Sequence, residues 1–134
     1  MRALQLTAYG KHGLALNQVR VPEPGPGELR IRVHHAGLNP VDWKTRDGKL
    51  RAILHYRLPQ TMGNEVAGVV DALGAGVRGY SIGDRVFARL AKERMGGFAD
   101  QVVTTVDLVA RVPAGVSTAV AAGVPLIALT AWQC

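Results

Sequence analysis

The sequence predicts a mainly β fold with some α: a partly open β-barrel with short helices and a helical segment at the C-terminal end. Short stretches of alternating apolar and polar residues fill most of the 134-residue chain, as in half-buried strands. The 16 glycines and 7 prolines separate these stretches and favour turns over long helices. Helix-forming sequence is concentrated after Ser117.

The strands are expected in a regular succession. The clearest covers residues 28–38, in which Leu29, Ile31 and Val33 face one side and the polar residues between them face the other. Before it, residues 2–8 and the stretch from Leu14 to Val19 alternate weakly. After it, apolar and β-branched runs predict strands over residues 66–73, 85–90, 97–103 and 107–112.

Helices are expected in two places. Residues 40–47 can form one or two turns, with Asn39 placed to cap them and Pro40 at the first helical position. Residues 49–60 show no periodicity and are expected to form an exposed loop. Ser117 can cap a helix that begins at Thr118, and Pro125 should separate this helix from a second one that ends near Trp132.

The composition narrows the classes of function. The single cysteine, Cys134, allows neither an internal disulfide nor a cysteine-based zinc site. No stretch resembles a leader or a membrane span. A cytoplasmic protein with no membrane partner is therefore expected. The net charge of +6 invites a nucleic-acid interpretation. The basic residues are spread along the chain, however, so a solvated basic face is the favoured interpretation. An anion-binding site is the alternative, and nucleic acid is not expected as a partner.

Two motif classes are excluded by spacing. The histidines, His12, His34, His35 and His55, show no metal-ligand spacing, and no metal site is expected. The only GxGxxG match, residues 74–79, precedes a turn and a strand instead of opening a helix. No dinucleotide-binding fold is therefore expected within this chain.

Two polar clusters stand out beside predicted strands. The first comprises Asn39, Asp42, Trp43 and Lys44, and the second is the pair Asn64 and Glu65. Glu65 lies next to an apolar strand, so it would be partly buried and would need a partner, for which Arg85 or Lys44 could serve. From the chemistry alone, a structural role, in which Asn39 caps a helix and Glu65 forms a buried ion pair, is favoured over a catalytic one.

Taken in order, several segments resemble the medium-chain dehydrogenase/reductase superfamily. They are Pro-Glu-Pro-Gly-Pro-Gly-Glu at 22–28, Ala-Gly-Leu-Asn-Pro-Val-Asp-Trp-Lys at 36–44, Gly-Asn-Glu-Val-Ala-Gly-Val-Val at 63–70, Gly-Asp-Arg-Val at 83–86, Gly-Phe-Ala-Asp-Gln-Val-Val at 97–103 and Leu-Thr-Ala-Trp-Gln at 129–133. Each motif is weak, but the ordered set spans nearly the whole chain. The resemblance implies a GroES-like domain over residues 1–116. Residues 117–134 would start the connection to a nucleotide-binding domain that these 134 residues do not include.

The departures from the zinc-dependent members indicate a branch. Asn39 stands where those enzymes carry a catalytic cysteine, and Asn64 stands where they carry a histidine ligand. The chain is thus similar to zinc-independent quinone oxidoreductases, which reduce quinones or activated enones with NADPH. The resemblance implies catalytic roles for Asn39, Asp42 and Asn64, and cofactor contacts for Lys44 and Thr130, although NADPH binding by these 134 residues alone is doubtful.

Two other functions compete with this interpretation. A stand-alone GroES-like binding module could dock a partner protein or a polyanion. A co-chaperonin would be expected to carry a mobile apolar loop, whereas the loop from Lys49 to Arg57 is basic. The sequence also predicts an apolar surface over residues 120–132, through which the chain could self-associate.

Overall fold

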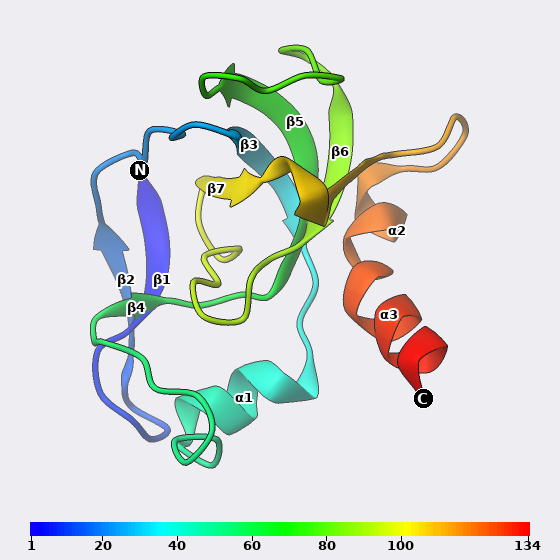
Figure 1. Ribbon diagram of the computed structural model, residues 1–134. Coiled ribbons are helices and arrows are strands. Elements are labelled where there is room, and N and C mark those ends of the chain that lie inside the picture. Colours follow the sequence, from blue (N-terminus) through cyan, green and yellow to red (C-terminus); the bar gives the residue numbers. More distant parts are fainter.

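The computed structural model describes residues 1–134, and its eight strands form two antiparallel sheets (Figure 1). The smaller sheet has the strand order β2-β1-β4 and the larger one the order β7-β3-β5-β6-β8. The strands are β1 (Arg2–Leu6), β2 (Leu14–Gln18), β3 (Glu28–Ala36), β4 (Gln60–Thr61), β5 (Glu65–Leu73), β6 (Arg85–Arg89), β7 (Gln101–Thr105) and β8 (Val109–Arg111). The mainly β prediction is therefore confirmed.

The two sheets meet without closing into a complete barrel. A single bridge pairs Ala3 of β1 with Ala99, just before β7, and the Leu4 N–H donates to the Phe98 carbonyl at 2.8 Å. The Asp100 N–H also donates to the Arg2 carbonyl at 3.1 Å, and side-chain packing completes the junction. Leu6, Met62 and Met95 form a small buried cluster there, beneath the half-buried Phe98.

The main core lies on the larger sheet and follows from the alternation seen in the sequence. Leu29 and Ile31 of β3 are fully buried, as are the apolar residues that face them from β5 and β6. The members of this core are Leu29, Ile31, Val66, Val70, Val86, Ala88, Leu90, Val102 and Val109. Burial of these side chains fixes the register of the sheet, and with it the place where β5 begins.

Three α-helices flank the sheets: α1 (Pro40–Arg46), α2 (Thr118–Ala122) and α3 (Pro125–Gln133). In Figure 1, α1 lies below the sheets, whereas α2 and α3 lie to the right beside β5 and β6. The predicted cap of α2 is present, because the Ser117 hydroxyl accepts the Val120 N–H at 3.2 Å. No helix in the structure combines the length and the apolar character that a crossing of the bilayer needs.

Several predicted boundaries are wrong. The strand expected at 97–103 begins only at Gln101, because the Gly97 and Phe98 N–H groups instead bond to the Gly63 and Met62 carbonyls. The strand expected at 107–112 opens as a 3-10 helix, Val106–Leu108, and is extended only over β8. Strand β4 forms at the end of the segment expected to be a loop.

Candidate active site

The three residues predicted to be catalytic lie together at the N-terminal end of α1, against the start of β5. The Asp42 carboxylate accepts the Asn64 amide at 2.7 Å and the Asn39 backbone N–H at 2.8 Å. The Asn39 side-chain amide donates in turn to Glu65 at 2.6 Å. Asn39 is the N-terminal cap residue of α1, as expected, but its amide nitrogen is directed toward Glu65 of β5.

These four residues, which we call the buried quartet, are almost inaccessible to solvent. Asn39 is 5% exposed, Asp42 and Asn64 are 2% exposed, and Glu65 is 1% exposed. Each carboxylate accepts two N–H groups, since Glu65 also receives the backbone N–H of Leu126 at 2.7 Å. Such complete pairing is what allows polar groups to stay buried without a large desolvation cost.

The buried quartet carries two acidic groups and has one nearby cation. Burial raises the pKa of Asp42, against the hydrogen bonds from Asn39 and Asn64 that lower it, and the Glu65 charge raises it further. Arg89 lies close enough for its charge to oppose this shift, and burial lowers the pKa of Arg89 itself. The Arg89 guanidinium donates to the Asn64 carbonyl at 3.1 Å and also to the Leu90 carbonyl.

Neither partner expected for Glu65 is correct. In the β5–β6 pairing, Glu65 stands opposite Arg89, and Arg85 lies at the other end of β6, where it donates to the Val116 carbonyl. Four residues along a strand correspond to about 13 Å, which is too far for a contact. Lys44 points away as well, and its ammonium group lies 5.7 Å from the centre of the Trp43 ring.

The two predicted cofactor contacts lie outside the buried quartet. Lys44 is exposed, and Thr130 is exposed on α3 with its hydroxyl donating to the Leu126 carbonyl at 2.7 Å. The glycine run at 74–79 connects β5 to β6 and opens no helix, so it cannot cradle a pyrophosphate in the usual way. The residues of this chain therefore do not fit a complete dinucleotide site.

Sequence reasoning missed three contributors to the site. Arg89 could have been found by aligning the two apolar strands β5 and β6, because their register places it opposite Glu65. The Leu126 backbone N–H carries no sequence signal, since every residue except proline has one. Gly37 has a packing role that only the structure shows: a Cβ atom there would lie 2.1 Å from Glu65 Oε1.

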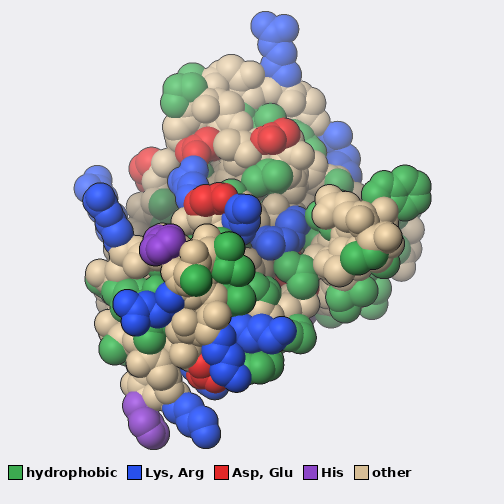
Figure 2. Space-filling model, turned by 60° about the horizontal axis from the view of Figure 1, so that its bottom comes forward, with side chains coloured by type: hydrophobic (Ala, Val, Ile, Leu, Met, Phe, Trp, Pro, Cys, Tyr) green, Lys and Arg blue, Asp and Glu red, His purple; other side chains and the backbone are tan.

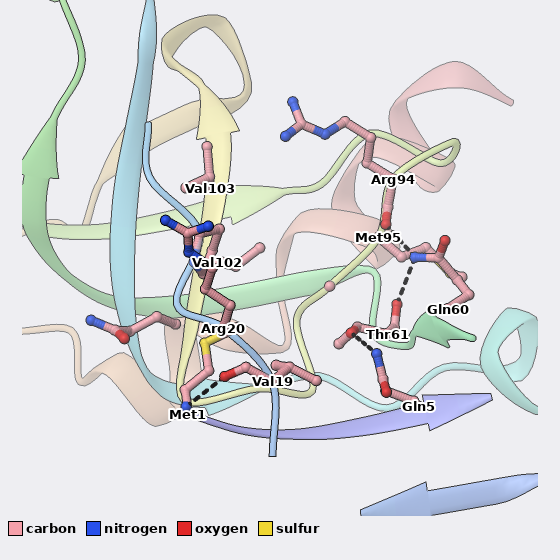
Figure 3. Close-up of a pocket in the computed structure, with 13 residues that line it drawn as sticks. Met1, Gln5, Val19, Arg20, Gln60, Thr61, Arg94, Met95, Val102 and Val103 are labelled. Atoms are coloured by element: carbon pink, nitrogen blue, oxygen red, sulfur yellow. Dashed lines mark hydrogen bonds between the residues drawn. The ribbon is translucent and has the colours of Figure 1, made fainter. Parts of the chain in front are cut away.

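Besides a hollow of about 500 Å³ between β6, β8 and α3, whose lining includes Arg89, two smaller hollows differ in character. One of about 170 Å³ adjoins Asp42. It is mostly apolar and is lined by Leu4, Leu14, Leu38, Asp42, Trp43, Arg46, Met62 and Phe98. A second, of about 290 Å³, lies between β1, β4 and β7, where Gln5 and Gln60 point toward Thr61 and bond to it (Figure 3). This second hollow contains none of the predicted site residues. No three His, Cys, Asp or Glu side chains converge as a metal-binding group anywhere in the structure.

Comparison with known proteins identifies the family. Residues 25–114 match the family model of the alcohol dehydrogenase GroES-like domain. The chain is 38% identical over 135 residues to a chloroplast envelope quinone oxidoreductase homolog of Arabidopsis thaliana, covering 99% of this chain and 41% of that protein. It thus spans about 40% of the length of the curated quinone oxidoreductase relatives.

Solved structures agree with the sequence comparison. The quinone oxidoreductase of Coxiella burnetii superposes with a TM-score of 0.89 at 32% identity, over 99% of this chain and 43% of that one. The Escherichia coli quinone oxidoreductase complexed with NADPH superposes with a TM-score of 0.82 at 26% identity, over 91% of this chain and 36% of that one. This chain accordingly belongs to the alcohol dehydrogenase GroES-like domain family, in the quinone oxidoreductase-like branch of the medium-chain dehydrogenase/reductase superfamily.

Proposed function

We propose that the chain is the substrate-side domain of an NADPH-dependent reductase that acts on quinones or other electron-poor enones. The observation that carries this proposal is the pairing of two asparagine amides with two buried carboxylates at the start of α1. The Asn39 amide has two hydrogens, and its bond to Glu65 uses one of them. The other can be offered to the carbonyl oxygen of an acceptor, where it would stabilise the negative charge that develops on reduction.

The remaining parts of the proposed site are less enclosed. NADPH would supply the hydride. Lys44 provides an exposed cation for an anionic part of the cofactor, and Thr130 provides a hydroxyl on α3. The apolar hollow beside Asp42 lies next to the buried quartet and offers a water-poor surface to a flat, uncharged ring. An acceptor that is already electron-poor needs orientation and a hydrogen-bond donor more than it needs strong polarisation.

The binding part of this proposal can be tested on the chain as it stands. A Cys134→Ser background is used, because the exposed thiol would add covalently to a quinone. A small fully substituted quinone is titrated into ¹⁵N-labelled protein. We expect shifts at the Asn39 and Asn64 side-chain amides and at Trp43. Shifts confined to the hollow between β1, β4 and β7, or no shifts at millimolar quinone, would contradict the proposal.

The activity of the isolated 134-residue polypeptide should be very low. Hydride transfer needs the nicotinamide and the acceptor held in near-attack geometry, and this positioning supplies a large part of the acceleration. Lys44 and neighbouring arginines give only weak, salt-sensitive attraction for NADPH. Absorbance of NADPH mixed with the chain and a quinone is expected to fall at the uncatalysed rate. Faster turnover that is abolished by Asn39→Ala would show that this polypeptide is catalytically complete.

A second function is supported by a different surface. On α2 and α3, the large apolar side chains Val120, Ile127 and Trp132 are exposed by 62%, 64% and 88%, and exposed apolar surface of this kind marks interaction sites. Apolar side chains also gather at the right of Figure 2, on the side where α2 and α3 lie, whereas basic side chains are scattered over the face in view. A protein-docking module would use the apolar side, and binding of a partner that leaves the buried quartet unperturbed would favour this function.

A further inference from the structure

Glu65 connects two elements that are remote in sequence, the loop that carries Asn39 and the first turn of α3. One of its oxygens accepts the Asn39 amide at 2.6 Å, and the other accepts the Leu126 backbone N–H at 2.7 Å. We propose that Glu65 is a positioning residue whose carboxylate fixes the direction of the Asn39 amide and holds α3 against the same loop. The inference rests on the proposed function only for the use made of Asn39, because the two contacts exist without any substrate.

The direction of the Asn39 amide follows from what each group can do. A carboxylate only accepts hydrogen bonds, and the Leu126 N–H only donates and cannot turn away from its helix. The Asn39 amide, in contrast, can rotate by half a turn about one bond. Glu65 therefore draws the amide nitrogen toward itself and leaves the amide oxygen on the opposite side, which decides what Asn39 presents to a ligand.

The contact with α3 replaces a missing helix cap. The N-terminal cap residue of α3 is Val124, whose side chain cannot accept a hydrogen bond, so the first N–H groups of the helix depend on other acceptors. Glu65 provides one from 61 residues away, and its negative charge also suits the positive end of the helix dipole. The Glu65 side chain thus holds both Asn39 and α3 in place. Helix α3 carries Thr130 and the exposed Trp132.

The surroundings of Glu65 are shaped to fit this bridge. A Cβ atom at Gly37 would lie 2.1 Å from Glu65 Oε1 and 2.8 Å from the Ala122 carbonyl oxygen, so only glycine leaves the loop and the end of α2 this close to the carboxylate. The Arg89 guanidinium lies near enough for its charge to compensate that of Glu65. A buried carboxylate with two N–H partners and a nearby cation is a built site rather than a chance contact.

Replacing Glu65 with glutamine tests this directly. The side chain keeps its shape but has only one acceptor oxygen left, because an NH₂ group replaces the other. That oxygen must face the Leu126 N–H, so the new NH₂ group faces Asn39 and forces the Asn39 amide to turn over. In NMR spectra of the 134-residue chain, we expect the Asn39 side-chain NH₂ signals to shift strongly, while the Leu126 amide stays protected from hydrogen exchange. Unchanged Asn39 signals in Glu65→Gln would overturn the proposal.

Removing the side chain should break both contacts. In Glu65→Ala, exchange protection at Leu126 should fall about 10- to 100-fold relative to the starting protein, the range expected for a hydrogen bond to a charged group. The exchange protection of the other α3 amides should fall together with that of Leu126. Glu23→Gln is the matched control, because it removes the same charge from an exposed side chain and should change none of these signals. Retained Leu126 protection in Glu65→Ala would mean that α3 is held by other contacts.

If Glu65→Ala does not fold, the contact between Asn39 and Glu65 can be tested by exchanging the carboxylate and the amide between these two positions. Asn39→Asp alone places two carboxylates against each other in a buried site and should lower the denaturation midpoint sharply. Adding Glu65→Gln restores a donor and an acceptor, so Asn39→Asp/Glu65→Gln should have a higher midpoint than Asn39→Asp alone. Equal or lower stability of the double variant would show that the two side chains are not coupled. None of these measurements involves NADPH or a quinone, so failure here is distinct from failure of the proposed function.

Discussion

Asp42 gives the molecule a titrating group that stands apart from its other shifted carboxyls. Its pKa is raised, chiefly by burial, whereas the pKa values of Glu28, Asp47, Asp84 and Asp100 are lowered by their arginine and backbone partners. A carboxyl whose pKa is raised by folding stabilises the native state below the unfolded pKa and loses that contribution as the pH rises through its folded pKa. The other four act in the opposite direction and destabilise the native state on acidification.

Asp42→Asn should isolate this effect. The free energy of unfolding is measured by denaturant titration for both proteins, from below the ordinary aspartate value of 3.8 up to neutrality. We expect the starting protein to lose stability relative to Asp42→Asn as the pH rises across this window, because only the starting protein must ionise the buried carboxyl at position 42. The four carboxyls with a lowered pKa are common to both proteins and cancel in the difference. A difference that does not vary with pH would contradict the assignment.

Gly37→Ala should be among the more destabilising small substitutions in the chain. The new methyl group would overlap Glu65 Oε1 and the Ala122 carbonyl oxygen, and overpacking of this kind costs about 1–3 kcal/mol. Gly123→Ala is the control, since its Cβ would meet nothing closer than the Val120 carbonyl oxygen at 3.9 Å. Chemical denaturation of the two variants should therefore give clearly different midpoints. Equal midpoints would mean that the loop at Gly37 moves aside freely.

At the residue scale, sequence reasoning identified members of the site but not its connections. Asn39, Asp42 and Asn64 stand out in the sequence because they form polar clusters beside predicted strands. Which group binds which depends on the β5–β6 register and on where α3 begins, and neither is visible in the local sequence. The assigned roles of these residues, like those of Lys44 and Thr130, stay predictions.

Among the elements, α2 is short and depends strongly on its cap. Ser117→Ala removes the acceptor for the Val120 N–H and should destabilise the protein by about 1 kcal/mol, within a range of about 0.5–2. Ser81→Ala is the matched control, because that side chain is exposed in a turn and has no hydrogen bond of its own. Thermal unfolding of both variants distinguishes them. A loss in Ser117→Ala no larger than in the control would show that packing of Ala121 and Ala122 alone holds α2.

Helices and strands were predictable from the sequence where local sequence signals determine them. Strands β5 and β6 follow from stretches rich in apolar and β-branched residues, and α1 and α3 follow from a proline at the first helical position. The strand predicted for the segment before β7 was wrong because the N–H groups of this segment bond to the Gly63 and Met62 carbonyls, more than 30 residues away. Pairing over such distances depends on how the sheets assemble, so a prediction from local alternation makes the strand too long.

For the molecule as a whole, the exposed side of α3 predicts self-association of this 134-residue chain. Ile127→Asp should lower the weight-average mass at high protein concentration, as measured by sedimentation equilibrium, because it places a charge in the apolar surface around Trp132. Ile82→Asp is the control, since Ile82 is 69% exposed on a turn far along the chain from α3. A starting protein that is monomeric at all concentrations would contradict this prediction.

The strand order of the larger sheet has a consequence for the nascent chain. Strand β3 lies between β5 and β7, and the Arg2 side chain and N–H both bond to Asp100. During synthesis, the N-terminal strands therefore wait, with open hydrogen-bonding edges, until the segment around residues 98–105 has left the ribosome. Unpaired edges of this kind invite pairing with other chains. A chaperone that shields β1 and β3 during this interval should raise the yield of folded protein.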